Sequence, residues 1–175
     1  MINFRKVLSG ARRMPLAVIL CSGLSVAFAT TAVTAQTATD TFNVTTSVGE
    51  ACSVSATDLG FGAYDPLSAT DTDATTTLGV TCTLTTTYDV GLDAGTGTGA
   101  TTTVRVMEFG ANTLNYALYQ EAGRTTIWGD SVGVDTVSGT GTGSSQSLTV
   151  YGRVPALQGV TPGAYTDLIT VTVTF

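Results

Sequence analysis

The sequence has no histidine, and beyond its first 35 residues it has no lysine and only three arginines. Without histidine or lysine, a serine or threonine nucleophile lacks its ordinary general base, so the sequence argues against a catalytic site. All thirteen acidic residues lie beyond residue 35, and this part of the chain therefore carries a formal charge of −10. So few cations cannot neutralise a phosphate backbone, and nucleic acid is not expected as a partner.

Long apolar runs are also missing, except near the start of the chain. Four basic residues precede an apolar run at 15–29, and small residues follow it, which is the pattern of a secretory signal peptide. Ala29 and Ala35 both fit the small-x-small rule for cleavage, and Ala35 is preferred because it leaves less apolar tail. The run is shorter than the ~20 residues that a bilayer requires, so no transmembrane segment is expected after the signal is removed.

Cysteine is scarce. Removal of a signal peptide at 1–35 discards Cys21 and leaves Cys52 and Cys82, an even pair in a chain expected to reach an oxidising compartment. We predict a disulfide between Cys52 and Cys82. A metal site is the alternative, but it lacks histidine and any CxxC motif, so neither a metal nor a cofactor is expected.

Roughly 140 residues remain after the signal, which is the size of one domain with its own core. Threonine, other β-branched residues and aromatic residues recur in short alternating blocks, and no stretch shows the 3.6-residue period of an amphipathic helix. This pattern predicts an all-β sandwich of two layers. The expected strands cover residues 42–48, 51–56, 78–83, 88–93, 103–109, 114–120, 146–154 and 165–175.

The first and last of these segments have complementary features. Along 165–175 the apolar residues alternate so that Ile169, Val171, Val173 and Phe175 share one face. Residues 42–48 alternate as well, with an inward set of Phe42, Val44, Thr46 and Val48. Alternation leaves open whether the first segment completes its own sheet or that of a neighbouring molecule.

Other motifs favour structural interpretations. The glycine-rich stretches 94–100 and 138–145 are predicted to be flexible loops, because neither precedes a helix or contains a basic residue that could hold phosphate. Asp65, Asp71 and Asp73 lie in one polar stretch, but their spacing does not match a calcium loop.

Aromatic residues and one asparagine offer two further alternatives. Trp128, Tyr116 and Tyr119 are candidates for stacking on sugar rings, although aromatic residues of a sandwich more often lie in the core. Asn43 begins a glycosylation triplet that we attribute to chance, because it lies inside an expected strand.

Several segments together resemble one known family. They are FNVTTSVGEAC at 42–52, LGFGAYDP at 59–66, VTC at 80–82, RVM at 105–107, LNYALYQ at 114–120, WGD at 128–130 and VYGRVPALQGVTPGAYTDLITVTVTF at 150–175. In this order, they make residues 42–175 similar to the spore coat protein U domain family, whose members resemble the pilins of archaic chaperone-usher pili.

The resemblance implies an immunoglobulin-like sandwich that lacks its last strand and is completed by strand donation. It divides the chain into a signal peptide at 1–35, a donor segment at 36–50 and a pilin-like domain at 51–175. The expected partners are a periplasmic chaperone, an outer-membrane usher and neighbouring pilin subunits. The chain is expected to pass through the periplasm into a surface pilus that supports adhesion and biofilm formation.

Two other hypotheses stay open at this point. In one, residues 42–48 are an ordinary first strand of a monomeric secreted sandwich that binds carbohydrate or protein. In the other, which has the least support, the domain is a secreted hydrolase whose carboxylates are paired only in the folded state.

Overall fold

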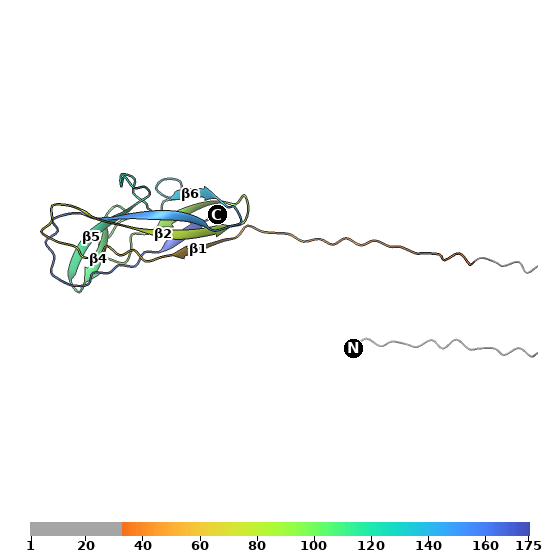
Figure 1. The fold of residues 1–175 in the computed structure, drawn as a ribbon, viewed down its shortest axis with the longest axis horizontal. Coiled ribbons are helices and arrows are strands. Elements are labelled where there is room, and N and C mark those ends of the chain that lie inside the picture. The colour runs from red at the N-terminus through yellow and green to blue at the C-terminus, as the bar shows by residue number, and fades with distance from the viewer. Residues whose placement is uncertain (1–32) are drawn as a thin grey trace, which may run out of the picture. The chain divides into compact units, whose positions relative to one another are not determined.

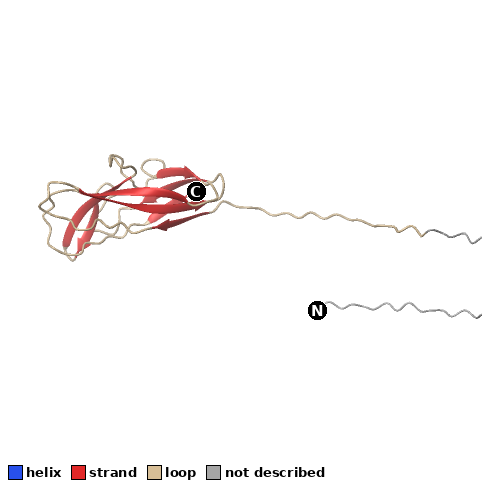
Figure 2. Cartoon of the chain, viewed as in Figure 1, coloured by secondary structure: helices blue, strands red, loops and turns tan. Residues whose placement is uncertain are grey.

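The structure is a computed structural model that describes residues 33–175, so most of the expected signal peptide, including Ala29, lies outside the described residues. The chain divides into two units, Met1–Val44 and Thr45–Phe175. Every strand of the described residues belongs to the second unit, and the rest of that unit is loop and turn (Figures 1 and 2). No helix within 33–175 has the length and apolarity needed to cross a membrane.

The folded unit contains eight strands arranged in two antiparallel sheets. They are β1 (Cys52–Ala56), β2 (Thr72–Cys82), β3 (Thr87–Leu92), β4 (Arg105–Phe109), β5 (Asn112–Tyr119), β6 (Val137–Thr140), β7 (Gln146–Val154) and β8 (Val171–Thr174). The larger sheet has the order β1-β2-β7-β5-β4, and the smaller sheet has the order β6-β3-β8. The predicted all-β class is confirmed.

The core lies between the inward faces of these sheets. Because side chains alternate across a strand, each central strand contributes every second residue to it. The largest completely buried side chains are Trp128, Arg105, Leu92, Val80, Val90, Val154 and Cys82. Trp128 also donates a hydrogen bond from Nε1 to the Val90 carbonyl oxygen at 2.8 Å, so it is a core residue and not a surface platform for sugars.

Two strands differ from the prediction. β2 begins at Thr72, six residues before the predicted start at Leu78, because its threonine-rich first half pairs with β7 from Thr72 opposite Val154 onward. Sequence alternation missed this half, which has no apolar residue larger than alanine. β6 lies mostly inside the stretch 138–145 that was predicted to be a loop, and it pairs with β3 despite its glycine.

The loop at 94–100 was predicted to be flexible, and the structure instead holds it by specific contacts. The backbone N–H of Thr96 donates to Asp167 Oδ1 at 2.7 Å, and that of Thr98 donates to Glu108 Oε1 at 2.7 Å. The hydrogen bond from Thr98 lowers the pKa of Glu108, because it favours the charged form of the carboxylate.

The two terminal segments also correct the prediction. Residues 42–48 form no strand, and all residues from 33 to 51 are exposed. A strand needs a partner for its backbone groups, and alternation alone cannot supply one. At the other end, regular pairing is limited to β8, while residue Thr166 makes only an isolated bridge with Glu108.

Candidate strand-binding groove

Two edge strands from different sheets lie close to one another. β1 is the outer strand of the larger sheet, and β8 is the outer strand of the smaller one. The two strands contact each other across the sandwich. An edge strand presents unpaired N–H and C=O groups, so this side of the domain is a place where a further strand can pair.

The core faces of both edge strands are only partly covered. Val54 of β1 lies opposite Val80, yet Val54 is 40% exposed while Val80 is 0% exposed. On β8, Val173 lies opposite the fully buried Val90 but is itself only partly buried. Directly opposed residues of an antiparallel pair share one face, so these differences show that the core is open between β1 and β8.

An elongated groove continues from this opening. One cavity of about 430 Å³ lies between residues 56–61 and 165–171, and its floor includes Leu78, Leu92 and Val150. A second cavity of about 550 Å³ lies between residues 59–66 and 160–165. Leu59, Phe61, Met107 and Tyr165 line both cavities, so the two form one continuous feature, which we call the groove.

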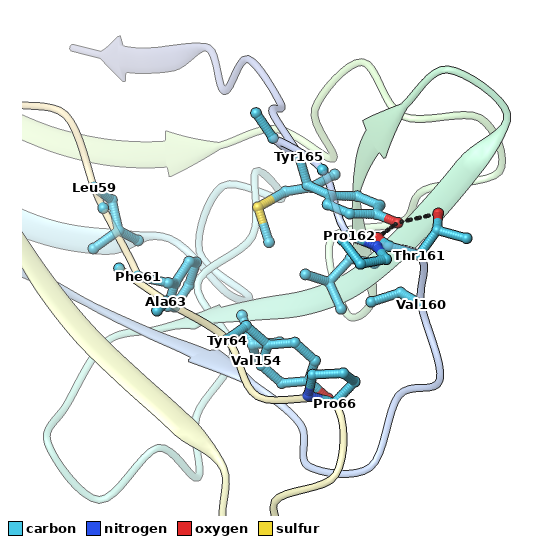
Figure 3. Close-up of a pocket in the computed structure, with 16 residues that line it drawn as sticks. Leu59, Phe61, Ala63, Tyr64, Pro66, Val154, Val160, Thr161, Pro162 and Tyr165 are labelled. Carbon is cyan, nitrogen blue, oxygen red and sulfur yellow. Dashed lines mark hydrogen bonds between the residues drawn. The ribbon is translucent and has the colours of Figure 1, made fainter.

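The first wall of the groove is the segment 57–66, which packs its side chains onto the larger sheet (Figure 3). The Phe61 ring meets the Tyr116 ring edge to face, with centroids 5.9 Å apart. Gly152 of β7 lies beneath Leu59 and Phe61, where a side chain at position 152 would collide with both. The Tyr64 hydroxyl donates to the Pro155 carbonyl oxygen at 2.9 Å and closes this end of the wall.

The second wall, residues 160–171, is held in place by side-chain hydrogen bonds to Tyr116 and Asp93. Asp167 Oδ2 accepts a hydrogen bond from the Tyr116 hydroxyl at 2.7 Å. Burial and this carboxylate both raise the pKa of Tyr116, so the phenol stays protonated and can donate. Asp93 Oδ1 accepts from the Thr170 backbone N–H at 2.9 Å. The wall is therefore in place before any strand binds.

A buried arginine supports the floor behind this wall. Arg105 is 0% exposed, and burial lowers the pKa of its guanidinium. It donates hydrogen bonds of 2.7–2.9 Å to the backbone carbonyl oxygens of Leu92, Asp93, Thr102 and Trp128. Carbonyl partners satisfy the donors of the buried cation without a carboxylate.

The predicted site residues fall into two groups. Ile169, Val171 and Val173 lie on the second wall and β8, partly buried against the core, while Phe175 beyond them is 55% exposed. In the donor segment, Phe42, Val44 and Val48 are 85–87% exposed, and Thr46 is exposed as well. That the first group accepts a strand and that the second group donates one both stay predictions.

The predicted disulfide is confirmed. Cys52 and Cys82 are bonded, and their Cα atoms are 4.1 Å apart on directly opposed positions of β1 and β2. The bond joins the edge strand to its neighbour at the point where the chain enters the domain.

The candidate calcium ligands have other roles. Asp73 accepts two hydrogen bonds from Arg153, which lower its pKa, and Asp71 lies 3.3 Å from the same guanidinium. Asp65 Oδ1 instead accepts from the Leu67 backbone N–H in a turn. These acids stabilise strand pairing and a turn, and no cluster of metal-ligating side chains occurs among residues 33–175.

Sequence analysis missed the first wall of the groove. LGFGAYDP contributed only to the family resemblance, although the alternation of Leu59 and Phe61 with glycines is a signal for an extended segment packed on the core. The signal was hidden because the segment makes no regular ladder.

Comparison with known proteins identifies a family, a relative by sequence and similar solved structures. A family model of the Spore Coat Protein U domain matches residues 38–172. Protein U of Myxococcus xanthus is 36% identical over 156 residues, which cover 81% of this chain and 87% of that protein.

One of the similar solved structures is a chain in the crystal structure of the CsuC-CsuE chaperone-tip adhesion subunit pre-assembly complex, from archaic chaperone-usher Csu pili of Acinetobacter baumannii. Its TM-score is 0.55 at 22% sequence identity, and the match covers 73% of this chain and 40% of the solved chain. At this identity the match shows similarity of fold alone.

Proposed function

The chain belongs to the Spore Coat Protein U domain family, and we therefore propose that it is a structural subunit of a secreted surface pilus, assembled by a chaperone-usher pathway. The observation that carries the proposal is the open core between β1 and β8, in a fold similar to that of a chaperone-usher pilus subunit complex. An edge that exposes both ladder groups and apolar core is prone to aggregation unless another strand covers it.

The proposed occupant of the groove is the donor segment of a neighbouring copy. Its inward residues would be Phe42, Val44, Thr46 and Val48, which are all exposed in the isolated chain. Strand addition of this kind obtains affinity from backbone hydrogen bonds and register from alternate side chains. Burial of one Phe and two Val at ~1.5–3 kcal/mol each contributes roughly 5–9 kcal/mol as an upper estimate.

A temporary partner is required before the donor arrives. We propose that a periplasmic chaperone covers the groove first and that an outer-membrane usher receives the subunit, as the pilus-like fold suggests. Export would follow cleavage of the signal peptide, and the mature subunit would reach the cell surface. Adhesion and biofilm formation are the proposed roles of the finished fibre.

The family and fold are those of structural pilus subunits and not of enzymes. No observation favours the alternative of a carbohydrate-binding monomer, because Trp128 and Tyr116 are buried in the core. Head-to-tail donation between copies does not close on itself, so filaments are the expected product.

The proposal is tested by deletion of residues 42–48. We expect the deletion variant to fold and to accept the donor segment of a wild-type subunit, but to form no fibres by itself, because it has a groove without a donor. Fibres are counted by electron microscopy, and acceptance is measured as capture of the variant by wild-type subunits.

The control replaces residues 42–48 with a glycine-serine sequence of the same length. The length of the chain is kept, and the apolar side chains are removed. This control should also fail to polymerise. Fibre formation by either variant at the wild-type level would show that residues 42–48 are not the donor.

A further inference from the structure

We infer that the spacing between the donor segment and β1 prevents a subunit from completing its own core, so that the groove is reserved for a second copy. The inference rests on the proposed function, because it takes residues 42–48 as the donor.

The core-facing positions of β1 are determined by its pairing with β2. Cys52 lies opposite Cys82 and Val54 lies opposite Val80, and both partners on β2 are buried. Even-numbered residues of β1 therefore face the core. The ladder continues to Ala51, since the Thr83 backbone N–H donates to the Ala51 carbonyl oxygen at 2.9 Å. Ala51 consequently points away from the core.

Only Gly49 and Glu50 lie between Val48 and Ala51. If the chain reverses here to pair with the free edge of β1, these residues form a two-residue hairpin loop. Glycine at the first central position suits the type II′ turn that such hairpins favour. The locally preferred reversal thus places Val48 directly opposite Ala51.

This hairpin turns the wrong side chains toward the core. With Val48 opposite Ala51, Ser47 lies opposite Cys52 and Thr45 lies opposite Val54. Val48 and Thr46 then point outward, because a shift of one residue moves every side chain to the other face. A subunit that closed on itself in this way would bury hydroxyl groups in an apolar groove.

The register that would turn Val48 toward the core requires a loop that is unfavourable in this chain. Placing Val48 opposite Cys52 needs a three-residue loop at 49–51, and such loops end in a residue with left-handed backbone conformation. That residue would be Ala51, which would have to leave its ladder with Thr83. A left-handed conformation is unfavourable for a residue with a Cβ atom.

Pairing with β8 instead of β1 is also restricted. The Cα atoms of Val48 and Ala51 can be at most about 11 Å apart, and packed sheets are about 10 Å apart, so the linker would be almost fully stretched. No residue would remain to reverse the chain. A segment that reversed along β1 would also run parallel to β8, and parallel pairing is the weaker kind. β1 and β8 run in opposite directions, because every pair from β1 to β4 is antiparallel and β4 makes an antiparallel bridge with Thr166 in the segment that leads into β8.

A donor segment from a second copy avoids these limits. Its linker leads to β1 of the second copy, whereas the groove that it fills belongs to the first copy. It can enter antiparallel to β8 with Phe42, Val44, Thr46 and Val48 facing the core. The two-residue spacing therefore selects exchange between copies over closure within one.

The test is the insertion of one glycine between Gly49 and Glu50. A two-residue Gly-Glu loop then fits between Gly49 and Ala51, and Val48 moves opposite Cys52, with its side chain toward the core. We expect at least a tenfold loss of fibres and a folded monomer whose β8 amides are protected from hydrogen exchange. The control inserts one glycine between Thr37 and Ala38, which leaves the spacing from Val48 to Ala51 unchanged and should preserve fibre formation.

A second measurement does not depend on the variant. Wild-type subunits released from their chaperone at high dilution should have rapidly exchanging β8 amides and should bind a synthetic peptide of residues 36–48. Protected β8 amides that exclude this peptide in dilute wild-type monomers would overturn the inference. If the glycine-insertion variant formed fibres at the wild-type level, the inference would also be overturned, but the proposal of strand exchange would not be affected. Failure of concentrated wild-type protein to polymerise would instead contradict the proposed function.

Discussion

At the scale of single residues, Arg105 shows how a polar side chain can organise an apolar sandwich. Its guanidinium is completely buried and bonds four backbone carbonyl oxygens from three separate segments of the chain. A buried carbonyl group that loses its partner costs about 1–3 kcal/mol. The arginine thus connects β3, the loop before β4 and the segment around Trp128 behind the groove.

Replacement of Arg105 by Met should be strongly destabilising, because it removes every donor and leaves these carbonyl groups unsatisfied. We expect a loss of about 3–5 kcal/mol in the free energy of unfolding, comparable to breaking a buried ionic network. Denaturant unfolding monitored by Trp128 fluorescence measures it. Arg153→Gln is the control, since Arg153 makes a partly exposed pair with Asp73 that should contribute less than about 1 kcal/mol. Equal stabilities of the two variants would contradict the role assigned to Arg105.

Glu121 provides a prediction of pH dependence. Its carboxylate accepts hydrogen bonds from the Thr125 hydroxyl and from the backbone N–H groups of Thr125 and Thr126, which lower its pKa from 4.5 to about 2. A depressed folded-state pKa contributes stability that is present above the unfolded pKa and is lost as the pH falls through the folded pKa. The contribution should therefore decline between pH 4.5 and about 2.

Glu121→Gln should flatten the stability curve in this window and leave its shape above pH 5 unchanged. Thr125→Val removes the hydroxyl donor and should give an intermediate curve. Thermal unfolding at a series of pH values measures both variants. A Glu121→Gln curve parallel to the wild-type curve throughout would show that the carboxylate does not have the assigned role.

At the scale of elements, β1 is the strand that most depends on a covalent bond. Four of its five residues are exposed, and it pairs only with β2 among the described strands. Its core-facing side chains therefore gain little from burial. The Cys52–Cys82 bond compensates by joining the first residue of β1 to a buried residue of a central strand.

Replacement of both cysteines by serine should cost roughly 3–4 kcal/mol in the free energy of unfolding, as the chain-entropy model gives for a loop of this length. Hydrogen exchange should increase most at β1 and at the wall 57–66 that follows it, and peptide binding to the groove should weaken. The same changes should appear when the wild-type protein is reduced, whereas reductant should not affect the variant. Unchanged exchange at β1 after reduction would contradict this role of the disulfide.

At the scale of the whole molecule, the domain is a sandwich whose core is open at the groove, where the edge strands β1 and β8 lie close together without pairing. The walls of the groove are held by side-chain hydrogen bonds at Tyr64, Asp93 and Asp167, so binding does not have to order them. Preformed surfaces bind with a smaller entropic cost than surfaces that must be ordered. The deletion of residues 42–48 and the glycine insertion both test whether copies of this molecule are joined through the groove.

The composition of the molecule is consistent with the proposed assembly of subunits. After residue 35 the formal charge is −10, and each of the three arginines is engaged inside its own domain. Like charges on neighbouring subunits oppose nonspecific association, which leaves the apolar groove as the main source of attraction.

Much of the fold could be predicted from sequence, because local periodicity reports which face of a strand is apolar. β7 matches its predicted bounds, and β3 and β5 match to within two residues, since Tyr88, Val90, Leu114 and Leu118 alternate clearly. β6 and the first half of β2 could not be predicted, because threonine and glycine give no contrast between faces. Their pairing is decided by strands distant in sequence.

The candidate site could likewise be predicted from sequence only in part. Sequence alone was sufficient to predict the paired cysteines and the alternating apolar residues of β8, since each depends on residue types at short spacing, whereas the strand predicted at 42–48 is absent. Only the tertiary structure decided that β1 and β8 lie side by side as unpaired edges, that the segment 57–66 forms a wall, and that Arg105 is buried. These features join residues far apart in the chain, and local periodicity carries no information about which edges meet.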